Sequence, residues 1–168
     1  MFDLNDQQAE TRKWARAFAE SEVLPRAAKM DEDGAYDTAI IDAMFDAGLM
    51  GLLIPEEHGG RGLSTLEYVT AVEELARCDA STALVMSIHS SLVTALLAAY
   101  ASEEMKGAVL PELASGKVGA FALTEEDPSK PTRADAGGDI FTASGTKMYI
   151  TNGPIADFIV LFAVTGVT

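Results

Sequence analysis

The chain has 168 residues, which is enough for one good-sized domain or for one domain and part of another. Hydrophobic residues make up 48% of it, so a substantial core is expected and intrinsic disorder is not. Its net charge of −14, from 26 acidic and 12 basic side chains, would repel both a nucleic-acid backbone and an anionic membrane surface.

The first predicted element is a helix from Leu4 to about Lys29. Asn5 or Asp6 can cap its start, and apolar side chains follow at three- and four-residue spacing. Pro25 lies in the last third, where a kink or a break is expected because proline lacks a backbone N–H. An acidic linker is predicted over Met30–Ala35.

A second helix is predicted over Thr38–Ala47, with Asp37 as its cap and Gly48 at its end. The stretch that follows, Met50–Ser64, is rich in Gly, Pro and Glu and is predicted to be a loop. A phosphate-binding loop is the alternative, but the glycine spacing fits neither a P-loop nor a dinucleotide-binding fingerprint.

The loop leads into a third predicted helix, Leu66–Arg77. Ser64 or Thr65 can cap this helix, and Glu67 is placed to complete a capping box. Residues 1–118 as a whole are therefore predicted to form a helical N-terminal domain, a bundle of about five helices.

The next predicted helix, Ala80–Ala101, carries no formal charge, and Asp79 can cap it. Because it contains six Ser or Thr residues and lacks flanking basic clusters, it is predicted to be a buried central helix and not a membrane span. His89 within it is interpreted as a satisfied core or interface histidine, with a catalytic role as the alternative. Ser102 is expected to cap a last helix, Glu103–Ser115.

The cysteine and the two histidines do not indicate a metal site or a reactive thiol. The single cysteine, Cys78, excludes an intramolecular disulfide and is interpreted as a buried thiol, because no His stands near it in the sequence. His58 and His89 lack ligand spacing, so no metal site is expected. The N-terminal sequence is polar and acidic without an export signal, so a cytoplasmic location is expected.

The sequence changes character after residue 118. Short β-rich runs separated by Gly, Pro and Asn turns predict an antiparallel sheet over residues 119–168. The last run is expected to remain an apolar edge without partners, which is an aggregation hazard. The four runs are Ala120–Thr124, Ile140–Thr142, Lys147–Thr151 and Phe158–Val164.

Three strings in this region identify a family. They are LTE at Leu123–Glu125, TRA at Thr132–Ala134 and GTKMYITNG at Gly145–Gly153, and together they resemble the acyl-CoA dehydrogenases. Members of this family are flavin enzymes that desaturate acyl thioesters of coenzyme A. The helical sequence upstream is similar to their N-terminal domain. The resemblance therefore implies a mainly α fold, in which a helical bundle is followed by part of an antiparallel β domain at 119–168.

The resemblance also implies the site residues of an FAD cofactor. Phe121, Leu123 and Thr124 would lie along the flavin ring, with the Thr124 hydroxyl at its polar edge. Tyr149 would pack near the ring, and the Thr151 hydroxyl would face its reactive nitrogen. The reaction needs this ring as hydride acceptor, hydrogen bonds to the thioester carbonyl and a carboxylate base.

The loop after LTE departs from the family pattern. Members usually continue with Pro and a small-residue loop that ends in Ala-Gly-Ser-Asp, whereas this chain has the shorter segment Glu126–Pro131. The segment lacks glycine, and its two added carboxylates would repel a pyrophosphate. Ser129 is the candidate for the lost serine, which serves the substrate. The loop is either an adaptation or a place where sequence is missing.

The family's catalytic glutamate comes from a C-terminal helical domain, so no catalytic residue is assigned here and no turnover is expected from this chain alone. Glu125, Glu126 and Asp127 are interpreted as turn and surface carboxylates. The implied partners are an acyl-CoA thioester, an electron-transfer flavoprotein or similar acceptor, and further chains of a homo- or hetero-oligomer. The alternative is a non-catalytic relative, a helical binding or assembly module that has lost the flavin.

Overall fold

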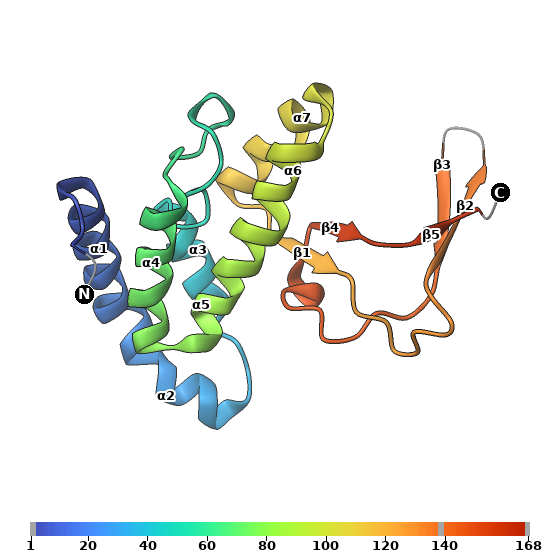
Figure 1. Cartoon of the computed structure of the whole chain (residues 1–168). Helices are drawn as coiled ribbons and strands as arrows, with labels where there is room; N and C mark the ends of the chain where they lie inside the picture. The colour runs from blue at the N-terminus through green and yellow to red at the C-terminus, as the bar shows by residue number, and fades with distance from the viewer. Residues whose placement is uncertain (1–2, 138–139, 167–168) are drawn as a thin grey trace.

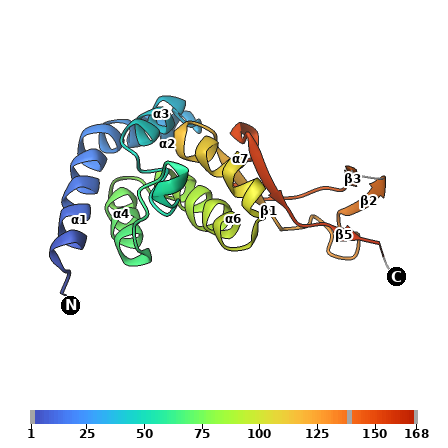
Figure 2. The ribbon, with the colours of Figure 1, turned by 90° about the horizontal axis from the view of Figure 1, so that it is seen from above.

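The structure is a computed structural model that describes residues 3–137 and 140–166. A helical part comes first in the chain, and a smaller β part extends from one side of it (Figure 1). Seen from above, the helices lie together at one end and the strands reach away from them (Figure 2). The prediction of a mainly helical chain that ends in a β segment is confirmed.

The first helical segment is continuous. α1 (Asp6–Phe18) runs through a π-helical turn, η1 (Ala19–Val23), into α2 (Leu24–Asp33). Pro25 comes just after this π-helical turn, and the helix continues past it without a break, although proline has no backbone N–H to donate. The predicted acidic linker, Met30–Ala35, is helical as far as Asp33. The helix ends at Gly34, which has a positive φ of 58°.

The remaining separate helices are α3 (Thr38–Asp46), α4 (Thr65–Cys78) and α7 (Glu103–Ser115). Their starts, and those of α1 and α5, follow the predicted caps, because a side-chain oxygen accepts a backbone N–H of the first turn in each case. The confirmed cap residues are Asn5, Asp37, Ser64, Asp79 and Ser102.

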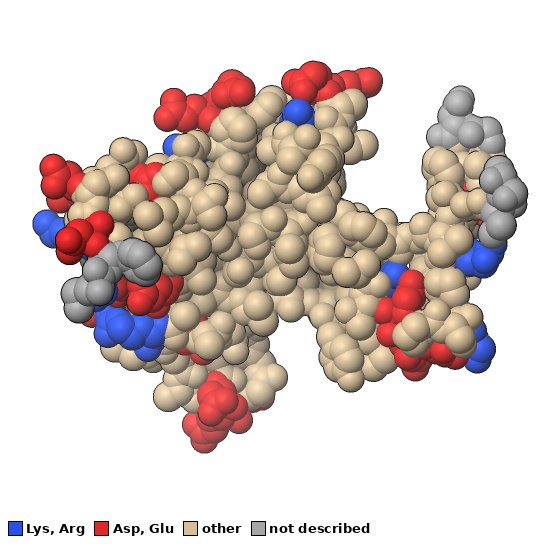
Figure 3. Space-filling view, in the orientation of Figure 1, with Lys and Arg blue, Asp and Glu red and all other residues tan. Residues whose placement is uncertain are grey.

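The predicted apolar helix is present and contains a second π-helical turn. It consists of α5 (Ala80–Ser87), η3 (Ile88–Thr94) and α6 (Ala95–Tyr100). Within the described part of the chain it is the one helix long and apolar enough to cross a membrane, by length and composition only, and buried core helices meet the same test. The face of the molecule over α5 and α6 shows no charged side chains (Figure 3).

Two hydrophobic clusters hold the fold together. The larger one joins α1, α3, α4 and α5 around fully buried side chains such as Met44 and Leu75. In the smaller one, Leu110 and Leu113 of α7 pack with Phe121 and Phe158 of the β part. Since fully burying one large apolar side chain contributes about 1.5–3 kcal/mol, this second cluster fastens the strands to the helices.

The loop between α3 and α4 is compact and includes a short 3₁₀ turn, η2 (Glu56–His58). A Cβ atom at Gly60 would lie 2.1 Å from the carbonyl oxygen of Ile54. Only glycine fits this close approach of two backbone segments, so this glycine has a packing function.

The strands form two small sheets. β1 (Gly119–Ala122) pairs in parallel with β4 (Phe158–Leu161). β2 (Arg133–Gly137) pairs antiparallel with β3 (Ile140–Ser144) and parallel with β5 (Val164–Thr165). The antiparallel arrangement expected for the whole segment therefore holds for β2 and β3, whereas β4 and β5 return alongside β1 and β2 in the same direction.

Two details of the β prediction are wrong. The apolar run Phe158–Val164 is not left without partners, because β4 pairs with β1 and β5 pairs with β2. The run Lys147–Thr151 is not a strand: one isolated bridge at Lys147 is followed by turns and by the 3₁₀ turn η4 (Gly153–Ile155). Tyr149 interrupts the extended backbone there with a φ of 57°.

Candidate functional site

Two segments that sequence analysis singled out lie side by side in the β part. At one end, Glu125 and Lys147 form an antiparallel bridge, and the N–H of Met148 donates to the carbonyl oxygen of Thr124 (3.0 Å). At the other end, the side chain of Asn152 donates to the carbonyl oxygen of Gly119 (3.0 Å). Residues 119–125 and 147–152 therefore run in opposite directions next to each other.

This arrangement brings the predicted flavin-site residues onto two neighbouring segments. Leu123 is 51% exposed and Tyr149 is 86% exposed, while Thr124 is exposed and Thr151 half-buried. Exposed apolar and polar groups thus lie on two neighbouring segments, a combination suited to a flat, partly apolar group with polar atoms at its edge.

Phe121 lies deeper than the other predicted ring contacts. Its side chain packs against the smaller hydrophobic cluster, and its ring meets the ring of Phe162 edge to face, with centroids 5.2 Å apart. Phe121 therefore lies between the helical part and the exposed side chains of Leu123 and Tyr149. A hollow of about 280 Å³ lies beside it, lined by Leu123, Glu125, Lys147, Phe162, Ala163 and Val164.

Glu125 is a half-buried carboxylate, which corrects its interpretation as a turn and surface residue. It accepts hydrogen bonds from the N–H and the hydroxyl of Thr132 (both 3.0 Å) and pairs with the ammonium of Lys147. Lys147 also donates to the carbonyl oxygen of Leu123 (2.9 Å). The Lys147 hydrogen bond holds the pKa of Glu125 below its usual value, so this carboxylate is ionised and engaged.

The altered loop, Glu126–Pro131, turns on itself. Ser129 is exposed, and both its N–H (3.0 Å) and its hydroxyl (2.7 Å) donate to one carboxylate oxygen of Asp127. These bonds lower the pKa of Asp127 and keep it charged. Acidic side chains are visible beside this loop in Figure 3. The assignment of Ser129 to substrate stays a prediction, and the loop offers no concentration of donors for a pyrophosphate.

Asn152 has a role beyond the turn that the sequence pattern predicts at this position. Asn152 adopts a left-handed backbone (φ 66°) that asparagine tolerates better than most residues, and its side chain is buried. The string Asn-Gly-Pro signals such a turn, but no local pattern indicates that the amide binds residues far away in the chain.

His89 is buried, as expected, but only one of its ring nitrogens has a partner. Nδ1 accepts the N–H of Gly119 (3.1 Å), whereas Nε2 has no hydrogen-bond partner among the described residues. Burial lowers the pKa of His89 to about 4, with the Leu113 and Met50 carbonyl groups opposing the shift. The interpretation as a satisfied histidine is thus half right, and the ring is neutral at pH 7.

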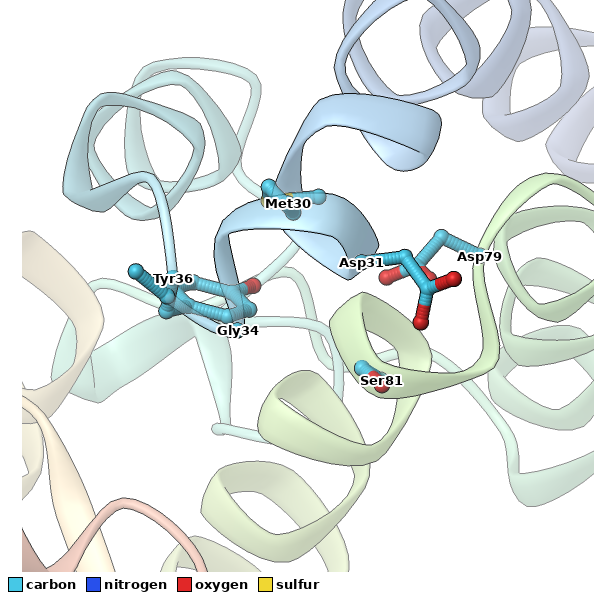
Figure 4. A pocket seen from close by; sticks show the side chains of 7 residues that line it. Met30, Asp31, Gly34, Tyr36, Asp79 and Ser81 are labelled. Carbon is cyan, nitrogen blue, oxygen red and sulfur yellow. The ribbon is translucent and has the colours of Figure 1, made fainter.

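A second hollow, of about 330 Å³, lies in the helical part near the start of α5. Figure 4 shows the carboxyl groups of Asp31 and Asp79 at one end of it and the ring of Tyr36 at the other. Asp79 is already used as a cap, since it accepts the N–H of Thr82 (2.6 Å), and burial raises the pKa of Tyr36. The described residues contain no group of three potential metal ligands here or elsewhere.

Residues 5–117 match the family model described as the N-terminal domain of acyl-CoA dehydrogenase. The chain belongs to the acyl-CoA dehydrogenase family. This confirms the resemblance inferred from the three strings in the β part and from the helical sequence before them.

Relatives in this family match the chain almost from end to end. The short-chain-specific acyl-CoA dehydrogenase of Clostridium acetobutylicum is 38% identical over 98% of this chain and 45% of its own length. The structure of butyryl-CoA dehydrogenase from Megasphaera elsdenii superimposes with a TM-score of 0.93 at 35% identity, over 99% of this chain and 46% of that one.

A third match comes from a structure with a reduced flavin. Glutaryl-CoA dehydrogenase from Mycobacterium smegmatis in complex with FADH2 is 29% identical, with a TM-score of 0.89 over 96% of this chain and 43% of that one. The chain thus spans less than half the length of the relatives it matches.

Proposed function

We propose that the chain forms the N-terminal half of an FAD-dependent acyl-CoA dehydrogenase, which introduces a double bond between the α and β carbons of acyl-CoA thioesters. The observation that carries this proposal is the pairing of segments 119–125 and 147–152, which gathers Leu123, Thr124, Tyr149 and Thr151 on neighbouring backbone. The relatives reported above act, by their names, on acyl-CoA substrates, and one of them holds FADH2.

The residues present fit the ring of the flavin better than its pyrophosphate. Leu123 and Tyr149 supply exposed apolar surface for the ring, and the hydroxyls of Thr124 and Thr151 supply polar contacts for its edge. The bound flavin would accept the hydride from the β carbon. Phe121 and Phe162 would exclude water from the inner side of the face.

The base is proposed to come from outside this stretch of sequence. Glu125, a carboxylate next to the face, is bound to Lys147 and Thr132 and is therefore unsuited to removing the α proton. We accordingly propose no turnover by the 168 residues alone, with an electron-transfer flavoprotein as electron acceptor and oligomer formation in the intact enzyme. A measured turnover of the isolated chain with an acyl-CoA and an acceptor would contradict this.

The alternative, a flavin-free assembly module, is favoured by one observation. Ser129 is turned to Asp127, and the charged carboxylate of Asp127 opposes a pyrophosphate. The two proposals differ in whether the purified chain takes up FAD.

The test is an absorbance spectrum of the purified chain after addition of FAD and size-exclusion chromatography. The proposal expects a flavin band that elutes with the protein and disappears in Leu123→Asp, since a carboxylate would face the ring. Leu84→Asp is the matched control, because Leu84 on α5 is equally exposed (49%). A colourless wild-type chain would favour the flavin-free module.

A further inference from the structure

Gly119, the first residue of β1, is held by two buried side chains. Nδ1 of His89, in η3, accepts a hydrogen bond from the N–H of Gly119 (3.1 Å). The side-chain amide of Asn152, from the opposite segment, donates to the carbonyl oxygen of Gly119 (3.0 Å). Both backbone polar groups of this residue, at the passage from helices to strands, are thus bound by side chains.

The Asn152 amide also reaches the helical part directly. Its Nδ2 atom donates a second hydrogen bond to the carbonyl oxygen of Val85 in α5 (3.1 Å). A side-chain amide carries two N–H donors, so both are used. One residue therefore joins α5, β1 and the segment that carries Tyr149 and Thr151.

Packing fixes the group to which Asn152 binds. A Cβ atom at Gly119 would lie 2.7 Å from Cγ1 of Val93, which is closer than non-bonded carbon atoms approach. β1 therefore lies directly against η3, and the Gly119 carbonyl oxygen has a set position relative to the helices.

The segment between Lys147 and Asn152 is bound at both of its ends. Lys147 and Met148 are bound to Glu125 and Thr124, and Asn152 is bound to the helical part and β1. Tyr149 is 86% exposed, so its own packing does not fix its direction. Asn152 is the residue that binds the C-terminal end of this segment directly to both α5 and β1.

We propose that Asn152 is a positioning residue. By binding Gly119 and Val85 it orients Tyr149 and Thr151, two of the residues proposed to contact the flavin ring. The inference rests on the proposed flavin function. Asparagine suits the position for two reasons: it tolerates the left-handed backbone, and its amide offers two donors to two carbonyl oxygens, which aspartate lacks.

The test compares Asn152→Asp and Asn152→Gly in the full chain with Pro154→Ala, an exposed neighbour, as the control. Asn152→Asp keeps the shape and removes the donors, while Asn152→Gly keeps the backbone conformation and removes the side chain. We expect the Kd for FAD to rise at least about tenfold in both variants, because each loses both buried hydrogen bonds of the Asn152 amide, with an altered visible flavin spectrum. Helical far-UV circular dichroism should remain unchanged, and Pro154→Ala should bind FAD as the wild type does.

A second readout does not depend on FAD. Labelling with 3-fluorotyrosine gives each of the four tyrosines a ¹⁹F resonance, and Tyr149→Phe assigns the one of interest. In Asn152→Gly the Tyr149 resonance should shift and broaden, while that of Tyr68, buried in α4, stays in place.

The two readouts separate the two proposals. A wild-type chain that binds no FAD defeats the flavin function, and the ¹⁹F result then decides the positioning role by itself. Unaltered FAD affinity and spectrum in both Asn152 variants, or an unmoved Tyr149 resonance, would overturn the positioning role. Loss of helical structure in both variants would also overturn it, since Asn152 would then be needed for folding as a whole.

Discussion

The helical part and the β part differ in the size of the side chains that they bury. The helices bury Met44, Leu75 and Leu110 completely, whereas the buried apolar side chains of β1 and β2 are alanines, such as Ala120 and Ala134. Exposed side chains of β3 include Phe141, at 64%. Because stabilisation scales with the apolar area removed from water, the helical part carries its own core and the β part depends on its ties to the helices.

The largest effect is expected from the helical core. Leu75→Ala should lower the free energy of unfolding by about 2–5 kcal/mol, because it removes a fully buried side chain and leaves a cavity. Phe141→Ala in the exposed hairpin is the comparison and should change it by no more than about 0.5 kcal/mol. Urea unfolding followed by far-UV circular dichroism measures both, and equal losses would refute the contrast between the two parts.

Burial of the neutral His89 ring should make the free energy of unfolding depend on pH. The folded pKa of about 4 lies below the ordinary value of 6.5. The neutral ring therefore contributes stability that is complete above pH 6.5 and is lost as the pH falls towards 4, roughly 3 kcal/mol in all. Urea midpoints of wild type and His89→Asn between pH 7 and 4 should converge as the pH decreases. Parallel curves over this range would contradict the prediction.

A smaller effect is expected from the ion-pair cluster between α1 and α4. Glu74 is 1% exposed and binds Arg12 (2.7 Å) and Arg16 (2.8 Å). Glu74→Gln should lower stability at pH 7 by about 2 kcal/mol, the range for hydrogen bonds to charged groups, while Glu73→Gln next to it should have little effect.

The pH dependence of the Glu74 contribution has a different window from that of His89. Hydrogen bonding with Arg16, aided by Arg12, lowers the pKa of Glu74 to about 2, from 4.5. Its contribution is therefore complete above pH 4.5 and is lost as the pH falls towards 2. Wild type and Glu74→Gln should keep a constant difference in urea midpoint above pH 5, and a difference that disappears already at pH 6 would exclude this assignment.

The smallest effect on overall stability is expected from the interactions of Glu125, beside the residues proposed to contact the flavin. Glu125→Ala removes the Lys147 pair and both Thr132 hydrogen bonds, all within the β part. Amide hydrogen exchange should accelerate at Thr132 and Met148 and stay unchanged in the helices. Glu126→Ala, at an exposed neighbour, is the control, and faster exchange throughout the helical part would show that the two parts are not separable.

Much of the helical fold could be predicted because its signals are local. Each predicted cap lies within three residues of the N–H that it binds, and the apolar side chains recur at helical spacing. The flavin-site strings were also readable as short motifs. The end of α2 was missed because the acidic residues of Met30–Ala35 suggested a linker, although they continue the helix as far as Asp33.

The sequence by itself determined the family, the order of the helices and the residues expected along a flavin ring. Only the tertiary structure decided that β4 returns parallel to β1, that Glu125 pairs with Lys147, and that Asn152 and His89 hold Gly119. These contacts join residues 22 to 39 positions apart, so no periodicity or cap signal encodes them. They form because packing brings donors and acceptors from distant parts of the chain within hydrogen-bond distance, where burial favours their pairing.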